Sequence, residues 1–220
     1  FTLIFHPHGW SSSDQFVELI DYAISKHGKK VKFLNFREAQ ERLDKNLLLG
    51  QPLRAANGQD NGVRLVDLNN DGYLDVLLRG VAGRTTRVWQ PETKTWLETS
   101  FPMPAVLTDH DGNHHESGLR FGVTELGKFT TVLVRNESFS GAWHFDGQQW
   151  VEDRSLLNGL DIAGQPLYTS LKNRDRGVRF RDVNNDGSCE LIVANETQNA
   201  ILRWSTDDKA WKKLPYALPP

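Results

Sequence analysis

Two short acidic stretches carry the residues of this sequence best suited to chemistry. DLNNDGYLD spans 67–75, and DVNNDGSCE spans 182–190. In both, carboxylate or amide oxygens fall at positions 1, 3, 5 and 9, and position 7 offers a backbone carbonyl. Oxygen ligands at this spacing can converge on one hard cation, and they select calcium over zinc or copper. The predicted calcium ligands are Asp67, Asn69, Asp71, the Tyr73 carbonyl and Asp75 in the first loop, and Asp182, Asn184, Asp186, the Ser188 carbonyl and Glu190 in the second.

An EF-hand does not account for these loops. It would place a glutamate at position 12 between two helices, whereas position 12 here is Leu78 or Val193 and the flanks alternate like strands. The expected role of the two ions is structural, since each would neutralise neighbouring acids and fix a loop between strands. A calcium-sensing role fits less well, because no helix pair is available to open. The alternative is that both stretches are Asp/Asn/Gly turns without a metal.

The loops belong to a repeat. GVRLVDLNNDGYLDVLL begins at Gly62, and GVRFRDVNNDGSCELIV begins at Gly177. Between them, GLRFGVTELGKFTTVLV begins at Gly118 and keeps the glycine, the arginine and the apolar alternation without the acids. Each copy ends in two tryptophans separated by six residues, at 89–96, 143–150 and 204–211.

This tryptophan spacing predicts a β-hairpin at the end of each copy, with the two rings directly opposed. In the middle copy the corner would be Asp146-Gly147, a signal for a two-residue type I′ turn. Each repeat then holds four short strands. In the first repeat these are expected at about 63–67, 74–79, 86–90 and 94–99.

Four antiparallel strands in each repeat are typical of a propeller blade. The acidic motif and its repeat resemble FG-GAP/VCBS repeats, the blades of integrin-like β-propellers. The resemblance implies a mainly β domain over 62–220, with blades at about 62–104, 118–156 and 177–215. The middle copy departs from the family pattern by lacking the ligands, and Glu190 is longer than the usual aspartate. Three blades do not close a ring, so further blades or a partner chain are expected.

The first fifty residues follow a different pattern. Apolar runs predict buried strands at 2–6 and 31–36. A helix is predicted between them, with a capping box at Ser12 and Gln15 and a stop at Gly28, and a second helix opens at Asn35. This β-α-β-α order indicates the remnant of an α/β barrel, whose parallel strands require neighbours. We therefore expect the chain to be a fragment of a longer protein.

A second resemblance concerns residues 1–48. LIFHPHGW, the helix and KVKFLNFREAQERL are similar to the C-terminal end of a polysaccharide deacetylase (NodB-type) domain. The resemblance implies that His6 is a general acid, with His8 as the less well matched neighbour. It places the catalytic zinc or other divalent metal in upstream motifs that this chain lacks, so the chain alone is expected to be inactive. The alternative for His6 and His8 is a polar loop without chemistry. Residues 49–61 would form the linker.

The composition narrows the class of partner. A net charge of −2 does not favour nucleic acid, and no apolar run is long enough to span a membrane. Calcium modules of low affinity fill outside the cytoplasm, so a secreted, periplasmic or cell-surface location is expected. Two functions remain open. One is a fragment of an extracytoplasmic carbohydrate-active hydrolase, a deacetylase end fused to a calcium-stabilised propeller. The other is a non-catalytic, calcium-dependent binding or adhesion module for a polysaccharide or another protein.

Overall fold

The computed structural model describes residues 11–48, 50, 52–80, 83–108, 114–125 and 127–216. The chain divides into two compact units, Phe1–Leu49 and Gly50–Pro220, and this division falls next to the predicted end of the N-terminal segment. The architecture is mainly β, with antiparallel sheets and few helices. The strand predicted at 2–6 lies outside the described residues. None of the helices that the structure describes has the length and apolar character needed to cross a membrane.

The described part of the first unit is helical. The backbone N–H of Ser12 donates to Gln15 Oε1 at 2.9 Å, and Gly28 follows the helix with a φ of +55°, which confirms the predicted start and stop. The elements are α1 (Ser13–His27), the 3₁₀-helix η1 (Gly28–Lys30), α2 (Phe36–Arg42) and the π-helical turn η2 (Leu43–Leu47).

The strand predicted at 31–36 is wrong. Residues 31–35 have no regular structure, and α2 begins at Phe36, whose side chain is 79% exposed. The reason is a strong helix start, because Asn35 Oδ1 accepts from the Glu38 N–H while Glu38 Oε2 accepts from the Asn35 N–H, both at 2.9 Å. No strand among the described residues of this unit offers a partner, so the apolar run lacks the pairing that a strand needs.

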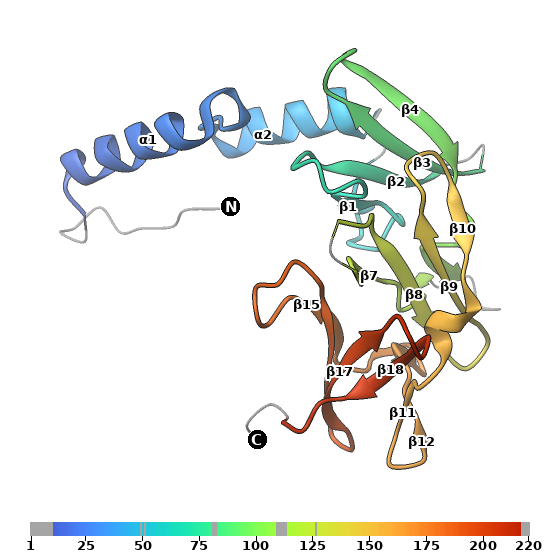
Figure 1. Cartoon of the computed structure of the whole chain (residues 1–220). Coiled ribbons are helices and arrows are strands. Elements are labelled where there is room, and N and C mark those ends of the chain that lie inside the picture. The colour runs from blue at the N-terminus through green and yellow to red at the C-terminus, as the bar shows by residue number, and fades with distance from the viewer. Residues whose placement is uncertain are drawn as a thin grey trace. The chain divides into compact units, whose positions relative to one another are not determined.

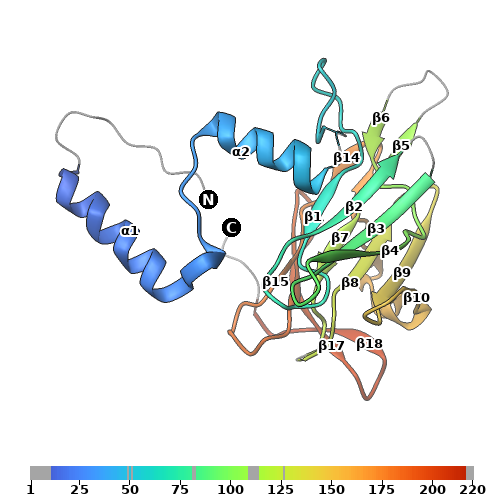
Figure 2. The same ribbon diagram turned by 90° about the horizontal axis from the view of Figure 1, so that it is seen from above.

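The second unit contains three four-stranded antiparallel sheets, one for each sequence repeat, which confirms four strands per repeat. Neighbouring strands follow one another along the chain, and the second sheet lies between the first and the third (Figures 1 and 2). The first sheet is β1 (Arg64–Val66), β2 (Asp75–Gly80), β3 (Gly83–Gln90) and β4 (Thr95–Ser100); the second is β7 (Arg120–Gly122), β8 (Thr131–Arg135), β9 (Ser140–Phe145) and β10 (Trp150–Glu152); the third is β15 (Val178–Arg181), β16 (Glu190–Ala194), β17 (Asn199–Ser205) and β18 (Ala210–Lys213).

Shorter elements connect the sheets. They are the pairs β5 (Val106–Thr108) with β6 (His114–Glu116), β11 (Asp161–Ile162) with β12 (Gln165–Pro166), and β13 (Ser170–Leu171) with β14 (Arg174–Asp175), and the 3₁₀-helix η3 (Arg154–Leu157). The apolar core forms two clusters. One joins the first and second sheets through residues such as Leu77 and Val132, and the other joins the second and third through Leu133 and Leu191.

The tryptophan hairpins form as predicted in two of the three repeats. Trp89 is paired with Trp96 and Trp204 with Trp211, with ring centroids 5.1 and 5.5 Å apart. In the middle repeat the prediction is wrong, because Trp150 pairs with Phe145, at 5.4 Å between centroids. Phe145 therefore takes the place that the first tryptophan occupies in the other two repeats.

The middle hairpin also lacks the predicted two-residue type I′ turn. Its last strand pair is Phe145 with Trp150, so four residues turn the corner. Asp146 Oδ1 accepts from the backbone N–H groups of Gln148 and Gln149, both at 2.8 Å. The other two hairpins also turn in four residues, but the turn fixed by Asp146 lies one residue further from the first tryptophan, which shifts the register by two residues.

A buried arginine connects the second and third sheets. Arg120, whose side chain is 8% exposed, donates through Nε to the Val178 carbonyl at 2.7 Å and through a guanidinium nitrogen to the Thr169 carbonyl at 3.0 Å. The same guanidinium lies 3.1 Å from Asp175 Oδ2. In the sequence this residue is the arginine of the middle repeat, and the structure gives it the role of an inter-sheet link.

Candidate metal loops and an adjoining pocket

The first acidic loop joins β1 to β2 and is held by its own carboxylates. Asp67 accepts from the backbone N–H groups of Asp71 at 3.1 Å and Gly72 at 2.9 Å. Asp71 accepts in turn from the Tyr73 N–H at 2.8 Å. Gly72 has a φ of +85°, which the bend requires. Each carboxylate oxygen has two lone pairs, so one accepted hydrogen bond leaves it able to bind a cation as well.

Asp75 closes this loop and is fully buried. Its two carboxylate oxygens accept from the backbone N–H groups of Leu68 and Trp89, both at 2.8 Å. Burial, together with the smaller effect of the charges of Asp71 and Asp67, raises the pKa of Asp75 to about 6 against the lowering effect of these two hydrogen bonds. A buried acid beside two others is the electrostatic situation that a bound cation relieves.

The Asp75 pKa predicts a pH dependence for the metal-free protein. Because the pKa is raised in the folded state, the folded protein binds a proton at Asp75 that the unfolded chain releases. Stability from this group is therefore present below about pH 4 and is lost as pH rises through about 6, by at most about 3 kcal/mol. Carboxyl ¹³C NMR titration in chelator is expected to show a midpoint near 6, and calcium should lower it. A midpoint near 4 in chelator would contradict this prediction.

Asn69 carries the clearest sign of a missing ligand in the first loop. Its Nδ2 donates to Asp71 Oδ2 at 3.0 Å, whereas its Oδ1 is buried without a hydrogen-bond partner among the described residues. A buried polar atom without a partner is costly and needs an explanation. An amide oxygen at position 3 of an acidic loop is a calcium ligand, so the residues present fit the ion.

The acidic loop of the third repeat, called the third loop from here on, joins β15 to β16 and repeats this geometry. Asp182 accepts from the backbone N–H groups of Asp186 at 3.1 Å and Gly187 at 2.8 Å, and the buried Glu190 accepts from Val183 at 3.1 Å. The amide at position 3 differs from the first loop. Asn184 Oδ1 accepts from the Asp186 N–H at 3.2 Å, so it is not left without a partner.

A cationic side chain already lies beside the third loop. The guanidinium of Arg203 forms an ion pair with Asp186 Oδ2 and lies 3.9 Å from Glu190 Oε1. Hydrogen bonds from Ser188 and Asn184, together with Arg203, lower the pKa of Asp186. The strand register places Arg203 opposite Glu190, where the first sheet has Val88 opposite Asp75. Val88 therefore cannot supply at the first loop the positive charge that Arg203 supplies at the third.

The remaining predicted site residues give no metal centre. His6 and His8 lie outside the described residues. Within the part of the chain that the structure describes, no three His, Cys, Asp or Glu side chains form a group that could hold a metal. An ion in either loop would thus depend on the amide and backbone carbonyl oxygens as well as on the carboxylates.

The equivalent loop of the middle repeat, which lacks the acids of positions 1, 5 and 9, lies between the two acidic loops. This middle loop, residues 123–130, joins β7 to β8. The Thr130 N–H donates to the Leu68 carbonyl at 2.8 Å and its hydroxyl donates to the Asp67 carbonyl at 2.9 Å. On the other side, the Cys189 N–H donates to the Val123 carbonyl at 2.6 Å. The three loops thus form one continuous hydrogen-bonded end of the unit.

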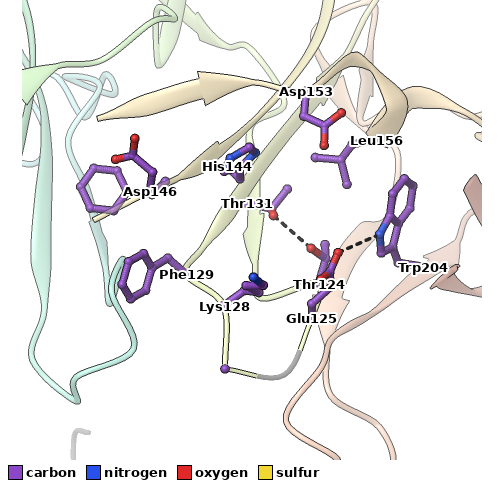
Figure 3. Close-up of a pocket in the computed structure, with 12 residues that line it drawn as sticks. Thr124, Glu125, Lys128, Phe129, Thr131, His144, Asp146, Asp153, Leu156 and Trp204 are labelled. Atoms are coloured by element: carbon purple, nitrogen blue, oxygen red, sulfur yellow. Dashed lines mark hydrogen bonds between the residues drawn. The ribbon is translucent and has the colours of Figure 1, made fainter. Parts of the chain in front are cut away.

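A cavity of about 550 Å³ opens where the middle loop meets the third sheet (Figure 3). Figure 3 shows Trp204 and Leu156 on one side of this pocket and Phe129 on the other, with His144 between them. Trp204 Nε1 donates to Glu125 Oε1 at 3.3 Å, which ties the middle loop to β17. Thr131 and His144 occupy the strand positions of Asp75 and Val88 in the first sheet.

Sequence reasoning missed three features of this region, the pocket, Arg203 and the link through Arg120. Arg203 could have been found by aligning the repeats at their first tryptophans, because Val88 precedes Trp89 whereas Arg203 precedes Trp204. The pocket left only an indirect signal, the loss of acids from the middle copy. Its walls come from segments that are far apart in the sequence.

Comparisons of the chain with protein-family models, with curated proteins and with solved structures find no match. The class that the fold itself defines is a mainly antiparallel β protein of repeated four-stranded sheets.

Proposed function

We propose that the C-terminal unit is a calcium-stabilised, propeller-type binding module of an extracytoplasmic protein, without catalysis of its own. The single observation that carries the proposal is the buried Asn69 Oδ1 without a partner, in a loop whose three acids include one with a raised pKa. Calcium is the cation that such a set of oxygen ligands prefers. Three similar sheets in succession, each made of four consecutive strands, support the propeller interpretation.

A binding role is favoured over catalysis by what the described residues offer. The strand expected at 31–36, which the deacetylase interpretation requires, does not form. The deacetylase interpretation therefore has no observation in its favour beyond the sequence resemblance. An extracytoplasmic location follows from the proposed calcium affinity, since sites of about 10⁻⁴–10⁻³ M fill only where calcium is abundant.

Calcium titration by isothermal calorimetry tests this proposal directly. The chain is expected to bind calcium with a Kd of about 10⁻⁴–10⁻³ M. The Asn69→Ala variant should lose the tighter binding event, because it removes an oxygen that has no other partner. Magnesium, which prefers six ligands at shorter distances, is expected to bind more weakly. An absence of calcium binding up to about 10 mM would refute the proposal.

The two loops are expected to differ in affinity because of Arg203. Its guanidinium neutralises part of the charge of the third loop and must be displaced or tolerated by an entering ion. We expect the Arg203→Val variant, which copies the first sheet, to bind calcium at the third loop about tenfold more tightly. The reciprocal Val88→Arg variant should weaken the first site. Two wild-type sites of equal affinity that do not respond to either substitution would contradict this prediction.

A further inference from the structure

The pocket beside the middle loop combines a suitable size with a mixed lining. Its volume of about 550 Å³ lies within the range of about 300–1,000 Å³ that small-molecule sites occupy. Aromatic rings of Phe129, Phe145 and Trp204 contribute apolar faces. Ionisable and hydroxyl side chains stand among them (Figure 3). A few polar groups among aromatic walls are typical of sites that orient a small polar molecule.

Several polar side chains of the pocket keep hydrogen-bonding capacity that contacts within the protein do not use. Among the residues that the structure describes, neither the Lys128 ammonium nor the His144 imidazole has a hydrogen-bond partner, and the Glu125 carboxylate has only the bond from Trp204. Asp153 uses Oδ1 to hold Ser155, which leaves Oδ2 for another donor. Donors and acceptors thus face the same cavity, as recognition of a group that both donates and accepts requires.

The charge of the lining selects among ligand classes. Glu125, Asp146 and Asp153 contribute three carboxylates, against the single permanent cation Lys128. An anionic ligand would meet this excess of negative charge. A wholly apolar ligand would bury the polar groups without partners, which is costly. A cationic ligand would be attracted by the carboxylates but repelled by the Lys128 ammonium in the same lining. A neutral molecule with hydroxyl groups and an apolar face can use the donors, the acceptors and the aromatic wall together.

We propose that this pocket binds a neutral saccharide residue, with an apolar ring face against Trp204 and its hydroxyl groups hydrogen-bonded to Glu125, Asp153, Lys128 and His144. A pyranose ring has C–H groups on its faces and hydroxyl groups around its rim, which matches an aromatic wall surrounded by donors and acceptors. The proposal gives the binding role inferred above a ligand class and a site. It therefore rests on that role, although not on calcium binding.

The pocket also has a structural rationale within the repeat. In the first and third loops, the carboxylates at position 9 fold back onto the loop backbone. In the middle copy Thr131 stands at that position, and its short side chain contacts Thr124 at 3.2 Å between hydroxyl oxygens. The loop thus lacks the acids of positions 1, 5 and 9, and its one carboxylate, Glu125 at position 3, accepts from Trp204 Nε1. Its neighbours on both sides hold it through the bonds of Thr130 and Val123.

Saturation-transfer NMR on the full chain tests the proposal. The probes are the methyl glycosides of glucose, galactose, mannose and N-acetylglucosamine, at up to about 10 mM. Glucuronate is the anionic comparison, glucosamine the cationic one, and hexane-1,6-diol a flexible chain with hydroxyl groups but no ring face. Binding of glucosamine as tight as that of the glycosides would overturn the proposal. At least one glycoside is expected to bind. Glu125→Ala and Trp204→Ala should each raise its Kd by about tenfold or more.

Trp89→Ala is the matched control, because Trp89 clasps the first hairpin as Trp204 clasps the third but lies away from the pocket. The Trp89→Ala variant should bind the glycoside with a Kd within about twofold of the wild-type value. The proposal is overturned if no glycoside binds, if glucuronate or the diol binds equally well, or if the pocket variants bind as wild type. Running each titration in calcium and in chelator separates this outcome from a failure of the metal proposal, which would be seen in the calorimetry instead.

Discussion

Calcium at about 10 mM is expected to raise the free energy of unfolding of the C-terminal unit by about 1.4 to 2.7 kcal/mol relative to chelator. This range follows from one site with a Kd of about 10⁻³ to 10⁻⁴ M, because a ligand that binds only the folded state stabilises it by mass action. For a unit of this size, the change corresponds to a rise of about 3 to 10 °C in Tm. The physical source is relief of the buried negative charge at Asp75 and the filling of the coordination of Asn69 Oδ1.

Scanning calorimetry in calcium and in chelator measures this effect. The Asn69→Ala variant should lose only a little metal-free stability, because it removes one bond, from Nδ2 to Asp71, while its Oδ1 has no protein partner, yet it should lose most of the calcium-dependent rise. Asn184→Ala in the third loop is the matched comparison. It should cost stability even in chelator, since its Oδ1 accepts from Asp186. A Tm that is the same in calcium and in chelator would count against both metal loops.

The Arg120→Ala variant is expected to lose about 3 kcal/mol of unfolding free energy. Arg120 joins the second sheet to the third by a buried bond of 2.7 Å to the Val178 carbonyl, and bonds the Thr169 carbonyl of the connecting segment at 3.0 Å. These carbonyls keep a second donor, from Arg179 and Arg176, so the loss comes from two charged hydrogen bonds, at about 1.5–3 kcal/mol each, and from the gap where the side chain packed. Arg120→Lys should recover little of the loss, because one ammonium cannot reproduce the forked geometry.

Urea denaturation compares this variant with Arg179→Ala, the arginine at the same place in the third repeat. Arg179 bonds Asp175 at 2.6 Å, but its side chain is 46% exposed. Exposed ion pairs contribute little, so a loss below about 1 kcal/mol is expected. Equal losses of unfolding free energy in the two variants would contradict this prediction, because the buried bonds of Arg120 would then contribute no more than an exposed ion pair.

Residue spacing by itself was enough to predict four-stranded repeats and two opposed tryptophan pairs. These features depend on contacts between residues close in sequence, and the pattern of side chains encodes such contacts directly. The caps at Ser12 and Asn35 were readable for the same reason, because a capping box needs only residues three apart.

The secondary-structure prediction was wrong where one short segment was compatible with two different structures. KVKFLNF has the apolar content of a strand, but Asn35 and Glu38 cap a helix whose start overlaps it, and no neighbouring strand is described to reverse the outcome. Asp146-Gly147 could turn a chain in two residues or in four. The carboxylate of Asp146, by accepting two backbone bonds, favours the longer turn and shifts Trp150 onto Phe145.

The sequence alone determined the metal-ligand pattern, since Asp67 to Asp75 and Asp182 to Glu190 carry their oxygens at fixed local positions. Only the tertiary structure decided which of those oxygens lacks a partner, that Arg203 supplies a positive charge at one loop where the other has Val88, and that Arg120 joins two sheets. It also decided that Trp204 and Glu125, 79 positions apart, share one pocket. The reason is physical: ligand spacing is a property of a short segment, whereas burial, charge compensation and cavities arise where distant segments pack together.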